Sequence, residues 1–200
     1  MRFSRYITHA FTTLLLFTSA NLIAAAQEQV LEENPQVLVR TTLGDFTLEL
    51  DLVNAPITVA NFLAYVDKDG FRETIWHRVV EGFMIQGGGF DIDMKQKSTN
   101  ATIQNEANNG IKNVKGSISM ARTSAPHSAS SQFFINVTDN SMLDFTSESP
   151  QGWGYAVFGQ VVEGLDIVLT IEEVATGNQG GHKDVPLEPV VINKATLLEQ

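Results

Sequence analysis

The chain has 200 residues, of which 43% are hydrophobic and 18% charged, an ordinary composition for one folded domain with a sizeable core. Its formal net charge of −10 argues against nucleic acid or an anionic membrane as a partner. Cysteine is absent, so the fold does not depend on disulfide bonds and no thiol is present for metal binding or nucleophilic catalysis.

The N-terminal segment differs in composition from the rest of the chain. Two arginines precede an apolar stretch that ends in three alanines at 24–26, small residues of the kind a signal peptidase reads. The alternative is a retained membrane anchor, but polar residues interrupt the run, and a spanning helix needs about 20 predominantly apolar residues. We therefore predict a cleavable signal peptide over 1–26 and a flexible leader over 27–36.

The segment after this leader has the pattern of a β-hairpin followed by a helix. Residues 37–42 and 46–51 are rich in β-forming side chains, and the Leu-Gly-Asp between them suits a turn. Pro56 is favoured in the first turn of a helix, and apolar residues then recur at helical spacing as far as Val66. Gly70 is placed to end this helix.

The rest of the chain is dominated by short strand patterns. Residues 76–90 (WHRVVEGFMIQGGGF) hold two apolar runs around a turn and predict two strands, which a polar loop over 91–115 follows. Further elements are predicted in chain order: strands over 117–121, 132–137 and 155–161, a helix over 164–174, a Gly-rich loop, and a last strand over 190–198. Many short strands with two helices favour a closed antiparallel barrel with helices at its ends, although periodicity alone leaves a sandwich open.

Strand alternation separates a core face from a second face that carries both apolar and amide side chains. In 132–137 the second face holds Gln132, Phe134 and Asn136, and in the preceding strand pair Met84 and Gln86 share a face. Apolar side chains beside hydrogen-bonding groups are typical of a shallow binding pocket. The alternative is that Phe134 and Met84 simply fill the core.

Three segments taken together resemble one protein family. The sequences WHRVVEGFMIQGGGF, SISMARTSAPHSASSQFFI and GYAVFGQVVEGLDIV closely resemble the cyclophilins, which are peptidyl-prolyl cis-trans isomerases. The resemblance covers roughly 37–198 and is nearest to exported bacterial members. It implies that 37–200 form an isomerase domain, a mainly β, closed eight-stranded antiparallel barrel capped by two α-helices, and that the mature protein is periplasmic.

The resemblance also implies the residues of the active site. Arg78 corresponds to the catalytic arginine of the family, and His77 to the histidine beside it. Gln86 and Gln132 correspond to polar contacts that are expected to bond both the substrate backbone and the guanidinium. The remaining positions are expected to bind substrate, four of them forming the proline pocket and two lying along the substrate chain: Phe83, Met84, Phe134 and Leu143, then Ala121 and Arg122.

Two substrate-binding positions depart from the pattern of many eukaryotic members. Met142 stands where those members have a tryptophan associated with cyclosporin binding, so we expect weak affinity for that drug. Tyr155 stands where many have a histidine. The loop over 144–154 is longer than usual and is expected to alter the rim of the pocket.

The leading functional hypothesis is an isomerase that acts on proline-containing segments of unfolded or partly folded exported proteins. It needs no cofactor and no metal, because no bond is broken, and we expect a monomer that binds neither nucleic acid nor, after signal removal, a membrane. The rival is a holdase that grips such segments, with isomerisation incidental. A barrel that carries a small ligand in its lumen is disfavoured by the apolar core face of 132–137.

Overall fold

The computed structural model describes residues 34–199. The predicted signal peptide over 1–26, and residues 27–33 of the predicted leader, lie outside the described residues. Regular structure starts with β1 at Gln36, the last residue assigned to the leader.

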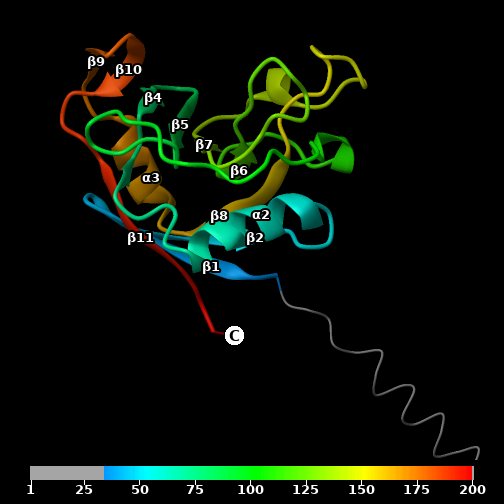
Figure 1. The fold of residues 1–200 in the computed structure, drawn as a ribbon, viewed down its shortest axis with the longest axis horizontal. Helices are drawn as coiled ribbons and strands as arrows, with labels where there is room; N and C mark the ends of the chain where they lie inside the picture. The colour runs from blue at the N-terminus through cyan, green and yellow to red at the C-terminus, as the bar shows by residue number, and fades with distance from the viewer. Residues whose placement is uncertain (1–33, 200) are drawn as a thin grey trace, which may run out of the picture. The chain divides into compact units, whose positions relative to one another are not determined.

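One antiparallel sheet of nine strands forms the body of the fold (Figure 1), so a two-sheet sandwich is wrong. The strands follow the order β3-β11-β1-β2-β8-β6-β7-β5-β4. Their bounds are β1 Gln36–Thr41, β2 Gly44–Leu50, β3 Thr74–Ile75, β4 Arg78–Val80, β5 Met84–Gly87, β6 Ser117–Met120, β7 Phe133–Asn136, β8 Val157–Glu163 and β11 Val191–Leu197.

The prediction of a closed eight-stranded barrel requires correction, because the hydrogen-bonded sheet has nine strands and stays open between β3 and β4. These two edge strands are nevertheless consecutive in the chain, separated only by Trp76 and His77. Three residue steps span at most about 11 Å, so the edges must approach each other at this point. The sheet is thus curled into a barrel-like form, while its ladder remains unpaired at the seam.

Two α-helices accompany the sheet, α2 over Pro56–Asp67 and α3 over Leu165–Glu172, close to the predicted spans. The first turn of α2 has no side-chain cap of its own. Instead, the carboxylate of Glu106 accepts hydrogen bonds from the backbone N–H groups of Ile57 and Thr58. A negative charge at a helix N-terminus is favourable, so the polar loop that carries Glu106 is fixed against this helix.

A cluster of aromatic rings fills the interior of the curled sheet. Phe62 of α2 is 1% exposed, and its ring centroid lies 4.9 Å from that of Phe71, 5.4 Å from that of Phe133 and 5.3 Å from that of Phe158. Trp76 packs edge-on against Phe133 with the centroids 5.5 Å apart. The buried rings agree with the apolar core face predicted for 132–137.

A two-stranded hairpin, β9 Thr176–Gln179 and β10 His182–Pro186, replaces the predicted Gly-rich loop. Its turn is formed by Gly180 and Gly181, both with positive φ. Figure 1 shows the hairpin, in orange, and β10 contacts β4. It therefore lies next to the strand that begins with Arg78.

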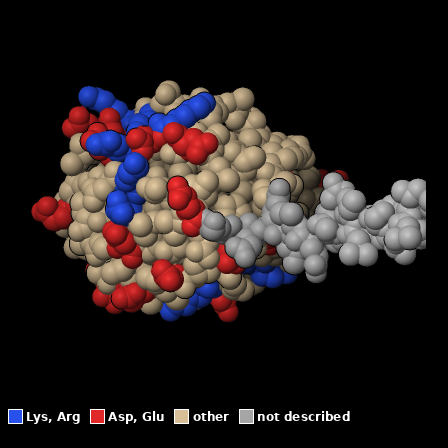
Figure 2. Space-filling model, turned by 90° about the horizontal axis from the view of Figure 1, so that it is seen from below, with Lys and Arg blue, Asp and Glu red and all other residues tan. Residues whose placement is uncertain are grey.

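The surface of the described residues carries both signs of charge. On the face drawn in Figure 2, basic side chains lie interspersed with acidic ones and do not form a continuous basic area. No helix within 34–199 is both long enough and apolar enough to cross a membrane.

The aromatic cluster predicts a large stability loss on truncation at its centre. We expect Phe62→Ala to lower the free energy of unfolding by about 3–5 kcal/mol, since it removes three ring contacts and leaves a cavity. Denaturant unfolding measures this. Val53→Ala serves as the control, because Val53 is 79% exposed and its truncation is expected to cost less than about 0.5 kcal/mol. Equal effects of the two variants would contradict the packing described.

Candidate active site

The strand register aligns three predicted site residues in one row. Arg78 on β4 lies directly opposite Gln86 on β5, and Gln86 lies directly opposite Phe134 on β7. Directly paired residues of an antiparallel ladder project from the same face, so these side chains share one side of the sheet. Alternation adds Met84, two residues before Gln86. The short turn between β4 and β5 therefore brings a cation, an amide and two apolar side chains together.

This face carries a pocket of about 200 Å³. Met84 and Phe134 are almost completely buried and supply its apolar base, and the other lining residues are more exposed. Nine residues line the pocket, and all nine are among the predicted site residues: Arg78, Phe83, Met84, Gln86, Ala121, Arg122, Phe134, Leu143 and Tyr155. The structure brings these residues together, while the roles assigned to them remain predictions.

The other three predicted site residues do not line this pocket. Gln132 lies next to it, because its Oε1 accepts a hydrogen bond of 2.9 Å from Nε2 of Gln86. His77 is buried, with its ring 4.6 Å from that of Phe90. Met142 is 73% exposed, outside the pocket.

The partner of Arg78 is a residue that the sequence pattern did not indicate. Nε of Arg78 lies 3.6 Å from Oδ2 of Asp184 on β10. Within residues 34–199 Arg78 makes no hydrogen bond to Gln86 or Gln132, which instead bond to each other. The expectation that these glutamines bond the guanidinium is therefore not met in this structure. The side chain that pairs with the guanidinium is that of Asp184.

The glycine run that ends the 76–90 segment makes room for Gln132. A Cβ built on Gly89 would lie 2.7 Å from both Cδ and Nε2 of Gln132, closer than such atoms approach in proteins. A side chain at this position would therefore displace the amide that bonds Gln86. The absence of a side chain at Gly89 keeps this pair of glutamines beside the pocket.

Arg122, which was expected to lie along the substrate chain, contributes its side chain to the pocket wall. Its guanidinium carbon lies 4.8 Å from the ring centroid of Tyr155, and its Nε donates a 2.7 Å hydrogen bond to the carbonyl of Gly154. Tyr155 in turn packs edge-on against Phe134, with the ring centroids 5.6 Å apart. Tyr155 is thus fixed from both sides at the rim.

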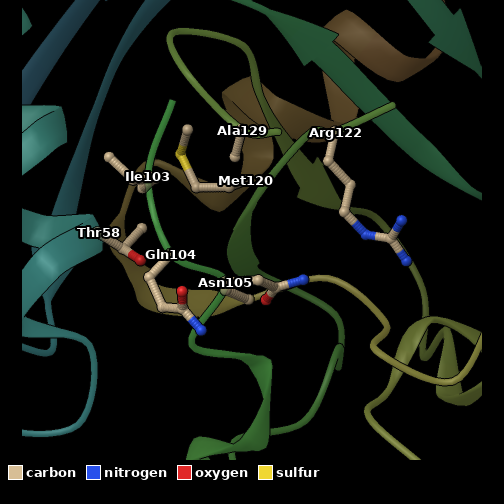
Figure 3. Close-up of a pocket in the computed structure, with 8 residues that line it drawn as sticks. Thr58, Ile103, Gln104, Asn105, Met120, Arg122 and Ala129 are labelled. Atoms are coloured by element: carbon tan, nitrogen blue, oxygen red, sulfur yellow. The ribbon is translucent and has the colours of Figure 1, made fainter. Parts of the chain in front are cut away.

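Arg122 also borders a second, smaller pocket beside α2 (Figure 3), whose other labelled residues include Thr58, Met120 and Ala129. Figure 3 shows the guanidinium of Arg122 directed away from these residues. The volume is about 10 Å³, room for no more than about one water molecule. This second pocket is therefore too small to be a substrate site.

Buried amides hold the loops that carry two walls of the main pocket. Nδ2 of Asn140 donates a 2.8 Å hydrogen bond to the carbonyl of Phe83, and the backbone N–H of Leu143 donates to the carbonyl of Asn140. Asn136 accepts a second hydrogen bond from Asn140 and is completely buried. Satisfied buried polar groups fix one arrangement of the chain, so Phe83 and Leu143 are held before any ligand arrives.

The pKa of His77 is lowered to about 4 from its ordinary value near 6.5. Burial of the imidazole is the main cause of the lowered pKa, and electrostatic repulsion from His182 and Arg78 acts in the same direction. The backbone of Ile75 and the side chain of Gln132 oppose the shift only in part. His77 is therefore neutral near pH 7 and adds no positive charge beside Arg78.

Comparison with known proteins agrees with this geometry. Residues 36–197 match the family model described as cyclophilin type peptidyl-prolyl cis-trans isomerase. The chain is 57% identical to a peptidyl-prolyl cis-trans isomerase of Streptomyces antibioticus over 81% of this chain and 98% of that protein. It is 55% identical to isomerase B of Escherichia coli over 82% and 99%, and 45% identical to isomerase A of Dickeya dadantii over 98% and 100%.

Solved structures support the same assignment. A crystal structure of a cyclophilin-type isomerase from Cryptosporidium parvum aligns with a TM-score of 0.67 and 26% identity, covering 84% of this chain and 99% of that one. A second structure of that protein, determined in the presence of the dipeptide Ala-Pro, aligns with the same TM-score and identity over 82% of this chain. The chain belongs to the cyclophilin family. Its activity is peptidyl-prolyl cis-trans isomerisation.

The buried neutral His77 predicts an acid-dependent loss of stability. Between pH 6.5 and about 4 the unfolded chain binds a proton at this residue while the folded chain does not, so stability falls as the pH falls through this window. We expect wild type to lose about 2–3 kcal/mol more than His77→Gln between pH 7 and pH 4.5. Denaturant unfolding at both pH values measures the difference. Equal losses in the two proteins would show that His77 is not held neutral.

Proposed function

We propose that the pocket around Arg78 performs the isomerisation of X–Pro peptide bonds and that Arg78 is its catalytic group. The observation that carries the proposal is the cross-strand row that sets Arg78 beside Gln86 and Phe134 in a pocket with an apolar base. The volume is smaller than that of the usual drug-sized site, which suits a guest as small as one pyrrolidine ring with its flanking peptide groups.

The chemistry requires a lower rotational barrier and no broken bond. A barrier of about 20 kcal/mol corresponds to roughly 0.01 events per second. Reaching on the order of 1000 per second requires lowering the barrier by about 7 kcal/mol. A site achieves this by binding the twisted amide more tightly than either planar isomer. In the twisted amide the nitrogen regains its lone pair, so a fixed cationic donor close to that nitrogen is favourable only there.

One group of residues holds the proline ring, and Arg78 polarises the amide that rotates. Met84 and Phe134 at the base, with Phe83 and Leu143 at the walls, hold the proline ring while the preceding carbonyl turns. The guanidinium of Arg78 supplies preorganised donors to the proline nitrogen and the adjoining carbonyl. The hydrogen-bonded pair Gln86–Gln132 and the backbone of Ala121 and Arg122 bind the substrate chain on either side of the proline.

The substrates we propose are proline-containing segments of exported proteins during folding, encountered by a monomer in the periplasm. Support comes from the pattern of residues 1–26, with its arginines, apolar stretch and terminal alanines. The Streptomyces and Escherichia relatives match over 81% and 82% of this chain but over 98% and 99% of their own lengths. About a fifth of this chain is therefore additional to those relatives, in line with a leader that the isomerase domain does not need.

The Arg78→Ala variant tests whether the pocket catalyses isomerisation or only binds the peptide. We expect the variant to lower kcat/KM for an X–Pro peptide at least about tenfold, because it removes the donor to the twisted amide. A protease-free isomerisation assay measures the rate, and calorimetric titration with the same peptide measures affinity. Arg72→Ala is the matched control, since Arg72 is an exposed arginine outside the pocket.

The same experiment decides between the isomerase and the holdase. A holdase needs the apolar pocket but has no need of Arg78. Undiminished turnover in Arg78→Ala would refute the proposed mechanism, whereas lost turnover with retained peptide binding is the outcome expected of the enzyme.

Export is tested on the full chain produced in a Gram-negative bacterium. We expect the protein in the periplasmic fraction with Gln27 as its first residue, which mass spectrometry of the purified protein identifies. Ala26→Arg is expected to block processing, because a signal peptidase accepts only small residues at that position, while Ala25→Arg is the control that leaves cleavage intact. Recovery of the unprocessed wild-type chain in the cytoplasm would contradict the predicted signal peptide.

A further inference from the structure

A carboxylate from a distant part of the chain meets the guanidinium in the pocket. Oδ2 of Asp184 lies 3.6 Å from Nε of Arg78, the nitrogen nearest the arginine backbone. Within residues 34–199 neither terminal nitrogen of Arg78 makes a hydrogen bond, and the side chain lines the pocket. The carboxylate thus pairs with the inner nitrogen of the guanidinium, while both terminal nitrogens remain available to a guest.

The backbone at Asp184 is unusual for a residue with a side chain. The register of the β9–β10 ladder is irregular between His182 and Val185, and Asp184 falls within this irregularity with a φ of 58°. This left-handed conformation is unfavourable for most residues, although aspartate and asparagine tolerate it. The bulge directs the carboxylate of an otherwise regular hairpin toward Arg78.

Ring contacts before Asp184 link the hairpin to the segment that carries Arg78, and the residue after Asp184 is buried. The ring of His182 lies 5.2 Å from that of Phe90, which lies 4.6 Å from that of His77, the residue preceding Arg78. On the other side of Asp184, Val185 is 2% exposed. The carboxylate therefore sits on a rigid support and is not the tip of a freely moving loop.

An ion pair of this exposure contributes little to folding. The side chains of Arg78 and Asp184 are 41% and 44% exposed, and pairs so open to water are weak because solvent screens them. Its consequence lies instead in orientation, since a long arginine side chain samples many rotamers unless a partner selects one. For a catalytic group, removing that freedom before the substrate binds lowers the barrier.

We propose that Asp184 is a positioning residue of the active site, which holds Nε of Arg78 so that the terminal nitrogens face the prolyl substrate. The inference rests on the proposed function of Arg78. With Asp184, the active site includes the β9–β10 hairpin as well as the residues that line the pocket.

The test is Asp184→Asn, which preserves the tolerance of a left-handed backbone and removes the negative charge. We expect kcat/KM to fall about three- to tenfold, mainly through kcat, since the apolar pocket still binds proline. Asp69→Asn is a matched control, because Asp69 also has a positive φ of 52° and an exposed ion pair, with Lys194 at 4.0 Å. Both variants are expected to unfold at a midpoint close to that of the wild type. Asp69→Asn is expected to keep full activity.

A double-mutant cycle shows whether Asp184 acts through Arg78. In an Arg78→Ala background there is no guanidinium to position, so Asp184→Asn is expected to cause no further loss of turnover. The Nε–Hε signal of Arg78 in the ¹H–¹⁵N spectrum is expected to shift in Asp184→Asn and to remain unchanged in Asp69→Asn.

Three outcomes overturn the proposal while leaving the role of Arg78 intact. The first is unchanged or increased turnover in Asp184→Asn, which would mean that the carboxylate weakens the cation and does not orient it. The second is an equal loss from Asp184→Asn in the wild-type and Arg78→Ala backgrounds, and the third is an Arg78 Nε–Hε signal that does not move. Full turnover in Arg78→Ala alone would instead refute the proposed function, so the two failures are distinguishable.

Discussion

The pairing register of three short strands is the constraint on which the site depends. Because Gln86 lies directly opposite Arg78 on one side and Phe134 on the other, a cation, an amide and an apolar ring leave the sheet side by side. A slip of one residue in β5 would turn the side chain of Gln86 toward the core and that of Ile85 toward the pocket. The aromatic cluster behind the sheet resists such a slip, since Ile85 and Phe133 are both almost completely buried on the opposite face.

Much of this arrangement could be predicted from local patterns and the family resemblance. Alternation alone assigned Phe134 to the face opposite the core and grouped Met84 with Gln86, and the structure places all three around one pocket. The first helix was indicated by Pro56 and its apolar spacing, and α2 starts at that residue. These features depend on neighbours within a few positions, and such short-range patterns are what a sequence displays directly.

The features that were missed depend on contacts between distant segments. The polar, glycine-containing stretch 176–186 shows no apolar alternation, so its sequence predicts a loop and not a hairpin. Without the hairpin, the pairing of Asp184 with Arg78 cannot be predicted. The expected closure of the barrel was wrong for a related reason. The chain leaves one sheet edge at Ile75 and enters the other at Arg78, which brings the edges close but leaves no residues to pair them.

In the proposed mechanism the guanidinium of Arg78 contacts the prolyl imide while the X–Pro bond is partway through its rotation. A crystal structure of the mature protein with a short X–Pro peptide tests it most directly. We expect the proline ring to pack against Met84 and Phe134, with a terminal nitrogen of Arg78 about 3 Å from the prolyl nitrogen or the preceding carbonyl oxygen. A peptide bound elsewhere, or a guanidinium turned out of the pocket with the proline in place, would contradict it.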